Sequence, residues 1–168
     1  MHKLGQYTLF FLIYSFLGAI GETLFRLLTE HQLYGINGFL HLPIMPIYGF
    51  GAILIIALLG SRIRHPLLLF GIGVLLTTIL EFVSHWLIEA VLGVRIWDYS
   101  QKPLNLDGRV SLDTSIGFGV AALLLVYFIH PQISRVLKRL PKQTTMIAAA
   151  IVWVVVSADF ISSVIERL

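Results

Sequence analysis

Residues 67–92 read LLLFGIGVLLTTILEFVSHWLIEAVL, and their charged side chains are Glu81 and Glu89. This run is longer than the roughly 20 apolar residues with which an α-helix crosses the hydrocarbon core of a bilayer. Its apolar residues are continuous, as expected of a helix surrounded by lipid and protein. The segment therefore predicts a transmembrane helix.

The composition of the whole chain points to the same class of protein. The chain has 168 residues, of which 57% are hydrophobic and 12% are charged, and its mean hydropathy is +0.88. A soluble domain is about half apolar and about a quarter charged. The composition therefore predicts an integral membrane protein and excludes a disordered chain, a coiled coil and, without cysteine, a disulfide-stapled domain. The net charge of +3 does not predict binding to nucleic acid.

Five apolar segments separated by turn residues are candidate membrane helices. The second of them is short and rich in glycine and proline, so we expect a broken or tilted helix there. The first exceeds the 7–15 residues typical of a signal-peptide core, so we expect it to be a retained helix. The prediction is an all-α fold, an integral membrane bundle of five transmembrane helices in a single domain over residues 1–168, with helices at about 6–28, 43–60, 67–92, 111–129 and 144–165.

The distribution of Lys and Arg predicts how these helices cross the membrane. With five crossings, the N-terminal Lys3 and the loops at 61–66 and 130–143 lie on one side, which then holds seven of the 12 Lys and Arg residues. All nine Asp and Glu lie on the other side or in the adjoining half of the membrane. Because cytoplasmic loops are enriched in Lys and Arg, we expect a multi-pass protein of the bacterial plasma membrane with a cytoplasmic N-terminus and an external C-terminus.

Acidic residues inside the apolar segments are the first candidate site residues. Glu22, Glu81 and Asp159 each lie in the outer half of a predicted helix. An ionised side chain at this depth is unfavourable unless it has a partner or faces water. Three such residues on one side of the membrane predict an organised polar region there.

Two helices place their polar residues on one face. Glu81, His85 and Glu89 recur every fourth residue, and Glu22 and Arg26 form a second such pair at a similar depth. The functional interpretation is a shared, outward-facing cavity in which Arg26 faces carboxylates. The structural alternative is a set of buried ion pairs that fix helix packing. Glu81 and Glu89 lie about 12 Å apart along the axis, so we expect neither a metal site nor a cofactor.

The polar segment 93–113 joins the outer ends of two predicted helices. Trp97 and Tyr99 suit a membrane interface, which is the structural interpretation. Its charged and amide side chains exceed what anchoring requires, and they are Asp98, Asn105, Asp107 and Arg109. We expect a tight turn at 105–109 that delivers Arg109 to pair with Glu81, Glu89 or an anionic ligand. Tyr48, in the Gly- and Pro-rich entry to the second helix, could reach the same cavity.

These residues resemble those of a known family. The likeness covers roughly residues 10–130 and departs from the family pattern at Ser111 and Asp113, and it does not extend to Asp159. The chain resembles the CmpB-like family of small bacterial membrane proteins, described as type IV ABC transporters, at Gly18-x-x-x-Glu22, Asn37-Gly-Phe-Leu, Pro43-x-x-Pro46-x-Tyr48-Gly49, Glu81 with Glu89, Trp97-Asp98-Tyr99 and Asn105-x-x-Gly108-Arg109. The resemblance implies transport.

The sequence leaves two functions open. The first is a transporter, permease or ligand-binding component for a small charged or polar solute, in which carboxylates hold a cation or proton and arginines clamp an anionic group. The ligand-binding residues would be Glu22, Arg26, Glu81, Glu89, Trp97, Asp98, Tyr99, Asn105 and Arg109. The alternative is an outer-leaflet enzyme acting on a lipid headgroup or a lipid-linked phosphate, with Glu81 or His85 as catalytic base.

The expected partners follow from the class of protein. They are membrane lipids, a small-molecule or lipid ligand, and either a second copy of the chain or a partner subunit, because five helices are few for a transport pathway. The sequence contains no Gly-x-x-x-x-Gly-Lys-Ser/Thr motif, so coupling to ATP would require a separate ATPase. We expect no nucleic-acid partner.

Overall fold

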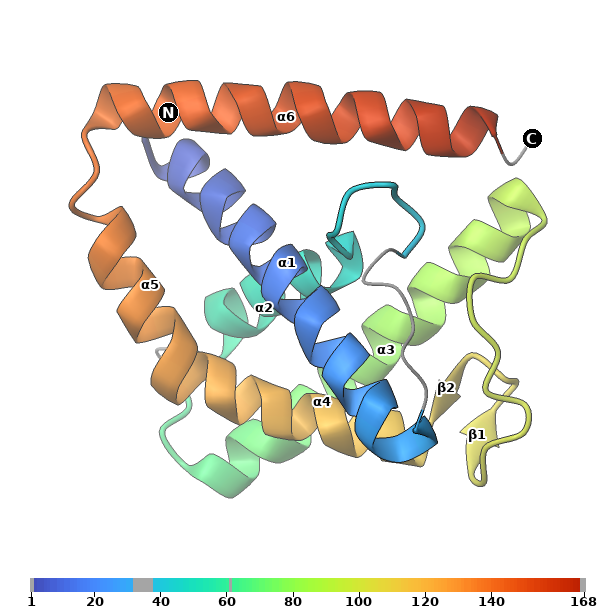
Figure 1. Ribbon diagram of the computed structural model, residues 1–168. Helices are drawn as coiled ribbons and strands as arrows, with labels where there is room; N and C mark the ends of the chain where they lie inside the picture. The colour runs from blue at the N-terminus through green and yellow to red at the C-terminus, as the bar shows by residue number, and fades with distance from the viewer. Residues whose placement is uncertain (1, 32–37, 61, 167–168) are drawn as a thin grey trace. The chain divides into compact units, whose positions relative to one another are not determined.

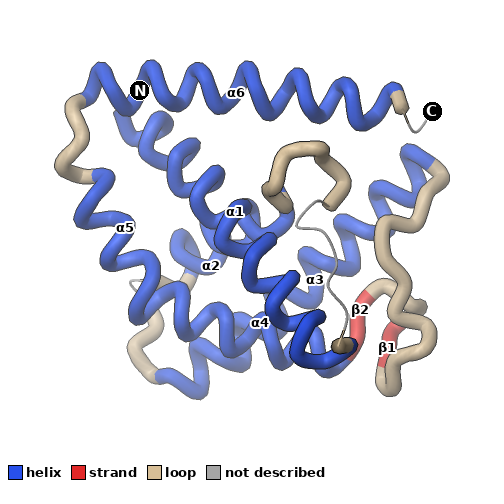
Figure 2. The backbone as a smooth tube through the Cα atoms, in the orientation of Figure 1, coloured by secondary structure: helices blue, strands red, loops and turns tan. Residues whose placement is uncertain are grey.

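Helices dominate the fold (Figure 1). The computed structural model describes residues 2–31, 38–60 and 62–166. A two-stranded antiparallel hairpin lies in the loop after α3 (Figure 2). The elements are α1 (His2–Glu30), α2 (Pro46–Leu58), α3 (Pro66–Leu92), β1 (Asn105–Leu106), β2 (Val110–Ser111), α4 (Leu112–Leu124), the π-helix η1 (Leu125–Ile129), α5 (His130–Leu137) and α6 (Lys142–Ile165).

Among the described residues, four apolar helices are long enough to cross a membrane, which supports the predicted helical membrane fold. The shorter α2 has 13 residues, which at 1.5 Å per residue gives about 20 Å. The expected helix at 43–60 is therefore shorter than predicted, and it begins at Pro46, a residue suited to the first turn of a helix. The four long helices are Lys3–Leu28, Pro66–Leu92, Leu112–Leu137 and Lys142–Ile165.

The third of these helices, Leu112–Leu137, runs further than the sequence indicated. We expected it to end near residue 129, before Pro131, but it continues to Leu137. The ring of a proline inside a helix clashes with the carbonyl four residues earlier, here that of Tyr127. The π-helical turn η1 contains Tyr127 and widens the helix directly before Pro131. The predicted loop at 130–143 is thereby reduced to residues 138–141.

The chain forms two compact units, which are described separately. Unit 1 comprises Met1–Ile53 with Arg135–Leu168, and unit 2 comprises Leu54–Ser134. The organisation of residues 1–168 as one transmembrane domain stays a prediction.

In unit 2, α3 packs along α4 through small side chains. Gly73 lies against Ala122, and both Ala122 and Leu69 are buried. The hydroxyl of Thr78 donates a hydrogen bond of 2.8 Å to that of Ser115. Small residues and hydroxyl pairs are the usual means by which helices associate in a membrane, because apolar burial alone does not favour protein over lipid.

In unit 1, α1 packs against α6 and against the start of α2. The indole nitrogen of Trp153 on α6 donates a hydrogen bond of 3.2 Å to the hydroxyl of Thr8 on α1. The amide nitrogen of Met45, just before α2, donates to the carbonyl of Ser15 on α1 at 3.1 Å. The outer faces of these helices remain apolar and exposed, as expected of a lipid-facing surface, and examples are Leu24, Leu28, Val154, Phe160 and Ile165.

Gly49 lies at a close contact between α1 and α2. A Cβ atom at Gly49 would lie 2.2 Å from Oγ of Ser15 and 2.7 Å from the carbonyl oxygen of Phe11. We expect Gly49→Ala to lower the free energy of unfolding by about 1–3 kcal/mol, the usual effect of overpacking. Gly21→Ala on α1 is the matched control, because a Cβ there has nothing within 4 Å. Thermal unfolding in detergent compares the two, and equal midpoints would contradict the close packing of α1 and α2.

Candidate functional site

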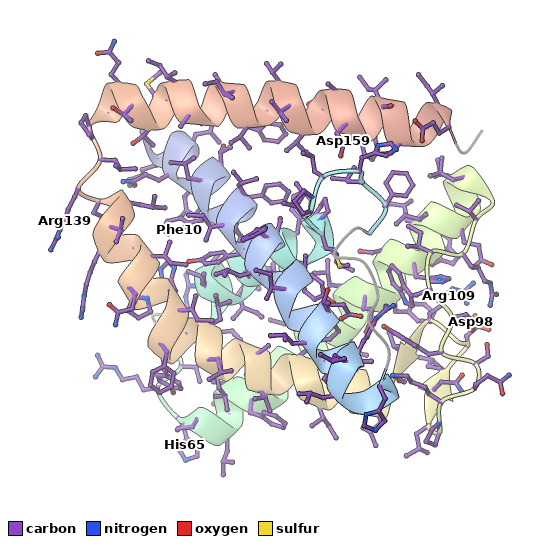
Figure 3. The ribbon with its side chains drawn as sticks, viewed as in Figure 1. Phe10, His65, Asp98, Arg109, Arg139 and Asp159 are labelled. Atoms are coloured by element: carbon purple, nitrogen blue, oxygen red, sulfur yellow. The ribbon has the colours of Figure 1, made fainter. Side chains whose placement is uncertain are left out.

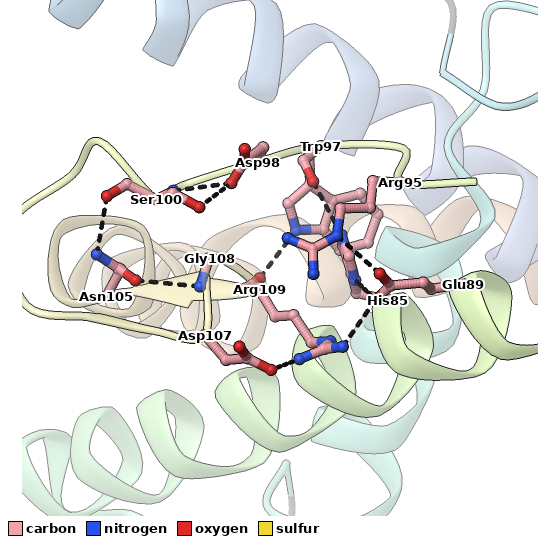
Figure 4. Close-up of polar contacts among 10 residues, drawn as sticks. All are labelled: His85, Glu89, Arg95, Trp97, Asp98, Ser100, Asn105, Asp107, Gly108 and Arg109. Atoms are coloured by element: carbon pink, nitrogen blue, oxygen red, sulfur yellow. Dashed lines mark hydrogen bonds and ion pairs between the residues drawn. The ribbon is translucent and has the colours of Figure 1, made fainter. Parts of the chain in front are cut away.

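The candidate site lies in unit 2, where the C-terminal end of α3 meets the loop that follows (Figure 4). The carboxylate of Glu89 holds two guanidinium groups. One oxygen, Oε1, accepts from Nε of Arg95 at 2.7 Å, and the other, Oε2, accepts from Nη2 of Arg109 at 2.7 Å. Arg109 also forms an ion pair with Asp107. The predicted pairing of Arg109 with an acid of α3 is therefore present, and Glu89 is that acid.

The two arginines differ in depth. The side chain of Arg109 is 11% exposed, whereas that of Arg95 is 43% exposed. The guanidinium carbon of Arg109 lies 5.5 Å from the centre of the Phe82 ring, within the range of a cation–π interaction. The carboxylate of Glu89 thus bridges the mostly buried guanidinium of Arg109 and the more exposed guanidinium of Arg95.

The hairpin delivers Arg109 to this position, as the predicted tight turn at 105–109 requires. Oδ1 of Asn105 accepts from the amide of Gly108 at 3.0 Å, and Nδ2 of Asn105 donates to the carbonyl of Lys102 at 2.8 Å. The backbone of Gly108 has a positive φ of 66°, a conformation in which glycine is favoured. The amide of Tyr99 donates to the carbonyl of Gly108 at 2.8 Å. Asn105 therefore builds the turn that presents Arg109.

Trp97 and His85 fix the loop to α3. The indole nitrogen of Trp97 donates to the backbone carbonyl of Arg109 at 2.9 Å. Nε2 of His85 lies 2.8 Å from the carbonyl oxygen of Trp97, and because a carbonyl only accepts, Nε2 carries the hydrogen. Nδ1 of His85 is 3.8 Å from Oε2 of Glu89. Within the described ranges, Nδ1 of the buried His85 and Nε of Arg109 have no hydrogen-bond partner.

Asp98 supports the loop through Ser100. Its Oδ1 accepts from the hydroxyl and from the amide nitrogen of Ser100, the latter at 2.9 Å. These hydrogen bonds lower the pKa of Asp98 below its ordinary value, since they favour the charged carboxylate. The hydrogen bond to Glu89 raises the pKa of Arg95, which is charged at any physiological pH. The loop therefore presents fixed charges near neutral pH.

Ser111 and Asp113 connect the loop to α4. The hydroxyl of Ser111 donates to Oδ1 of Asp113. The carboxylate of Asp113 pairs with Nζ of Lys102 at 2.9 Å. These contacts make Asp113 a part of the loop's support at the start of α4.

Glu81 lies two turns earlier than Glu89 on α3, and it is buried, with 4% of its surface exposed. His85, one turn later, is buried as well. The predicted polar stripe of α3 is therefore present as two buried residues followed by the ion-paired Glu89. Across residues 2–31, 38–60 and 62–166, no three His, Asp or Glu side chains are grouped to hold a metal ion.

The remaining predicted ligand-binding residues lie in unit 1. Nε of Arg26 donates to Oε1 of Glu22 at 2.5 Å, and the hydroxyl of Tyr48 donates to Oε2 of the same carboxylate. The pairing of Glu22 with Arg26 is thus confirmed, and Tyr48 joins it. The shared cavity predicted for Glu22, Glu81 and Arg109 stays a prediction.

Sequence reasoning missed two features. Arg95 was placed on the outer side but was not assigned to the site, although it follows Glu89 by six residues and pairs with it. The second feature is a polar cluster in unit 1. The sequence indicates it only through Asp159, an aspartate inside an apolar helix. The cluster comprises His41, Asp159, Ser163 and Glu166.

The chain matches a known family over nearly its whole length. No curated protein and no solved structure is significantly similar to the chain. The family described as "Putative ABC-transporter type IV", ABC_trans_CmpB, matches residues 9–164. The match includes most of α6, to which the resemblance noted from the sequence did not extend. Because the match covers nearly the whole chain, this protein belongs to the family so described.

Proposed function

We propose that the chain is a permease or solute-binding component for a small charged or polar solute, which binds where α3 meets the 93–111 loop. The observation that carries this proposal is the bridging of Arg95 and Arg109 by the single carboxylate of Glu89. A carboxylate or phosphate of a solute has the geometry to replace Glu89 on Arg109. Displaced from its cations, Glu89 would then be able to take a proton or a cation.

The depth of Arg109 supports an exchange of this kind. A guanidinium that is 11% exposed loses most of its hydration, so it needs an anionic partner at every stage. Asp107 also pairs with this guanidinium, and beside it Glu89 and a solute anion would alternate as partners. Glu81 and His85, both buried on α3, are proposed to continue the polar path toward the middle of the helix.

The membrane topology belongs to the same proposal. We propose that α2 forms the fifth crossing, with local thinning of the bilayer to match its 13 residues. The loops 62–65 and 138–141 then lie in the cytoplasm of a bacterial cell, and the loop 93–111 lies outside. If α2 does not cross, the sidedness of these loops is unchanged, because α2 precedes all of them. The N-terminus and the segment between α1 and α2 would then change side.

Single cysteines test the topology directly, because the chain contains no natural cysteine. We expect Gln101→Cys to react with a membrane-impermeant maleimide in intact cells and Gln143→Cys to react only after lysis. Lys3→Cys is expected to behave like Gln143→Cys. External labelling of Lys3→Cys would show that α2 does not cross, and external labelling of Gln143→Cys would contradict the proposed orientation.

The partners are also proposals. A separate ATPase would provide the energy for uptake against a gradient, and the exposed cations of the 135–142 region, including Arg139 (Figure 3), offer it a cytoplasmic surface. A second copy of the chain is the alternative way to complete a transport pathway. Anionic membrane lipids would meet the same cations.

One observation favours a second function, an enzyme of the outer leaflet. The hydrogen bond from Nε2 of His85 to the carbonyl of Trp97 leaves Nδ1 to accept a proton, and Nδ1 faces Glu89 at 3.8 Å. A histidine oriented in this way suits general-base catalysis, with Arg109 to hold a phosphate group of a lipid headgroup or lipid-linked substrate.

Uptake by proteoliposomes tests the proposed function. Vesicles with and without the protein are incubated with an isotopically labelled bacterial metabolite extract, and their contents are analysed by mass spectrometry. We expect one or a few charged solutes to equilibrate faster with the protein than without it. Arg64→Gln, a loss of charge on the opposite side of the membrane, is the matched control and should retain uptake. Conversion of added lipid headgroups without uptake would favour the enzyme.

A further inference from the structure

His41 connects the segment before α2 to α6 within unit 1. Its Nδ1 atom lies 3.0 Å from Oδ1 of Asp159, and its Nε2 atom lies 2.9 Å from Oε2 of Glu166. The hydroxyl of Ser163, buried on the same face of α6, is 3.0 Å from Nδ1. Asp159 projects from α6 where this segment approaches it (Figure 3).

The chemistry of these contacts requires a particular protonation state. An ionised carboxylate only accepts hydrogen bonds, so a ring nitrogen that faces one must carry a hydrogen. Both ring nitrogens of His41 face carboxylate oxygens. His41 therefore satisfies both contacts only as the doubly protonated, positively charged imidazolium.

We propose that His41 is a proton-binding site whose imidazolium form fastens the 38–45 segment to α6 and whose deprotonation releases that segment. The charged groups that face His41 in the described part of unit 1 are Asp159 and Glu166, both from α6. Neutral His41 has one N–H, so one of the two carboxylates would face a lone pair. This site is independent of the proposed solute site.

A backbone hydrogen bond between the 38–45 segment and α6 would also respond to the deprotonation of His41. The amide nitrogen of Leu42 donates to Oδ2 of Asp159 at 3.1 Å, whereas the amide of Met45 donates to the carbonyl of Ser15 on α1 at 3.1 Å. Release of the 38–45 segment from α6 would break the hydrogen bond of the Leu42 amide and would leave that of the Met45 amide in place. Asp159 is mostly buried, and these contacts explain how a carboxylate is accommodated in an otherwise apolar helix.

The direction of the pH dependence follows from these contacts. The hydrogen bond with Glu166, followed by that with Asp159, raises the pKa of His41 above its ordinary value of 6.5. A group whose pKa is raised by folding stabilises the folded arrangement fully below its unfolded pKa. That contribution is lost as the pH rises through the raised pKa of the folded state. The segment is therefore fastened below the raised pKa of His41 and released above it.

Nuclear magnetic resonance of the purified protein with ¹⁵N-labelled histidine tests the proton site, with His41→Gln to assign the signal. We expect the His41 midpoint to lie above 6.5 and to fall in Glu166→Gln, a variant at an exposed position that leaves α6 intact. His65→Gln, at the exposed residue before α3, is the matched control and should not change the titration midpoint of His41. A midpoint at or below 6.5, or one unchanged in Glu166→Gln, would overturn the proposal.

Residue-resolved hydrogen exchange, corrected for the intrinsic effect of pH, tests the release. We expect the exchange of the Leu42 amide to rise severalfold above the His41 midpoint, while that of Met45 stays constant. In His41→Gln the Leu42 amide should exchange fast at every pH. A Leu42 amide that is equally protected on both sides of the midpoint would overturn the release, and parallel changes at Leu42 and Met45 would indicate general unfolding instead.

Discussion

Arg109→Ala is expected to reduce solute uptake by about 10- to 100-fold, the factor that corresponds to one or two charge-assisted hydrogen bonds to an anion. The substitution removes the deep guanidinium that holds Oε2 of Glu89. The loop should persist, because Trp97 is bonded to the backbone carbonyl of Arg109 and not to its side chain. Uptake by proteoliposomes measures the effect, and near-UV circular dichroism checks the fold.

Two companion variants complete the comparison. One separates charge from geometry at Arg109, and the other tests the second cation that Glu89 binds, Arg95. Arg109→Lys keeps the charge but loses the planar fork, so we expect an intermediate rate. Arg95→Ala removes the surface cation, whose side chain is 43% exposed, and should have a smaller effect than Arg109→Ala because water already screens it. Equal uptake by Arg109→Ala and wild type would exclude Arg109 from the solute site.

Gly108→Ala is expected to destabilise the loop by about 2–5 kcal/mol through two additive effects. The positive φ of 66° disfavours any residue with a Cβ by about 1–2 kcal/mol. A Cβ there would also lie 2.5 Å from Oγ of Ser100 and 2.7 Å from Oδ1 of Asp98. The displaced loop would no longer hold Arg109 beside Glu89, so uptake should fall with it.

Gly93→Ala carries only the first of these effects, so its comparison with Gly108→Ala isolates the second. Gly93 has a similar φ of 67°, but a Cβ there would have nothing within 4 Å. The fluorescence of Trp97, measured in a background with the other two tryptophans replaced by phenylalanine, reports the state of the loop. We expect a red shift in Gly108→Ala and little change in Gly93→Ala. Identical spectra for the two variants would contradict the close contact of Gly108 with Asp98.

The membrane helices could be predicted because apolar composition and length determine whether a segment is stable in a bilayer. The regular spacing of Glu81, His85 and Glu89 likewise placed these residues on one face of α3, where the structure has them. The turn that presents Arg109 was predictable from Asn105 and Gly108, whose conformational preferences are local.

The errors arose where tertiary contacts outweigh local signals. Pro131 is a helix breaker, yet the π-helical turn before it lets the helix continue. His41 and Asp159 are 118 residues apart in sequence, so no local pattern connects them. The pairing of Arg95 with Glu89 depends on the path of the loop after Gly93, which the sequence does not specify.

Native mass spectrometry of the protein purified in mild detergent tests most directly whether the Glu89–Arg109 cluster binds a solute. The protein is incubated with a bacterial metabolite extract, and wild type is compared with Arg109→Gln and with the control Arg64→Gln. We predict a small charged molecule bound to wild type and to Arg64→Gln but absent from Arg109→Gln. Equal occupancy in all three proteins, or a bound lipid phosphate in place of a soluble solute, would contradict the account.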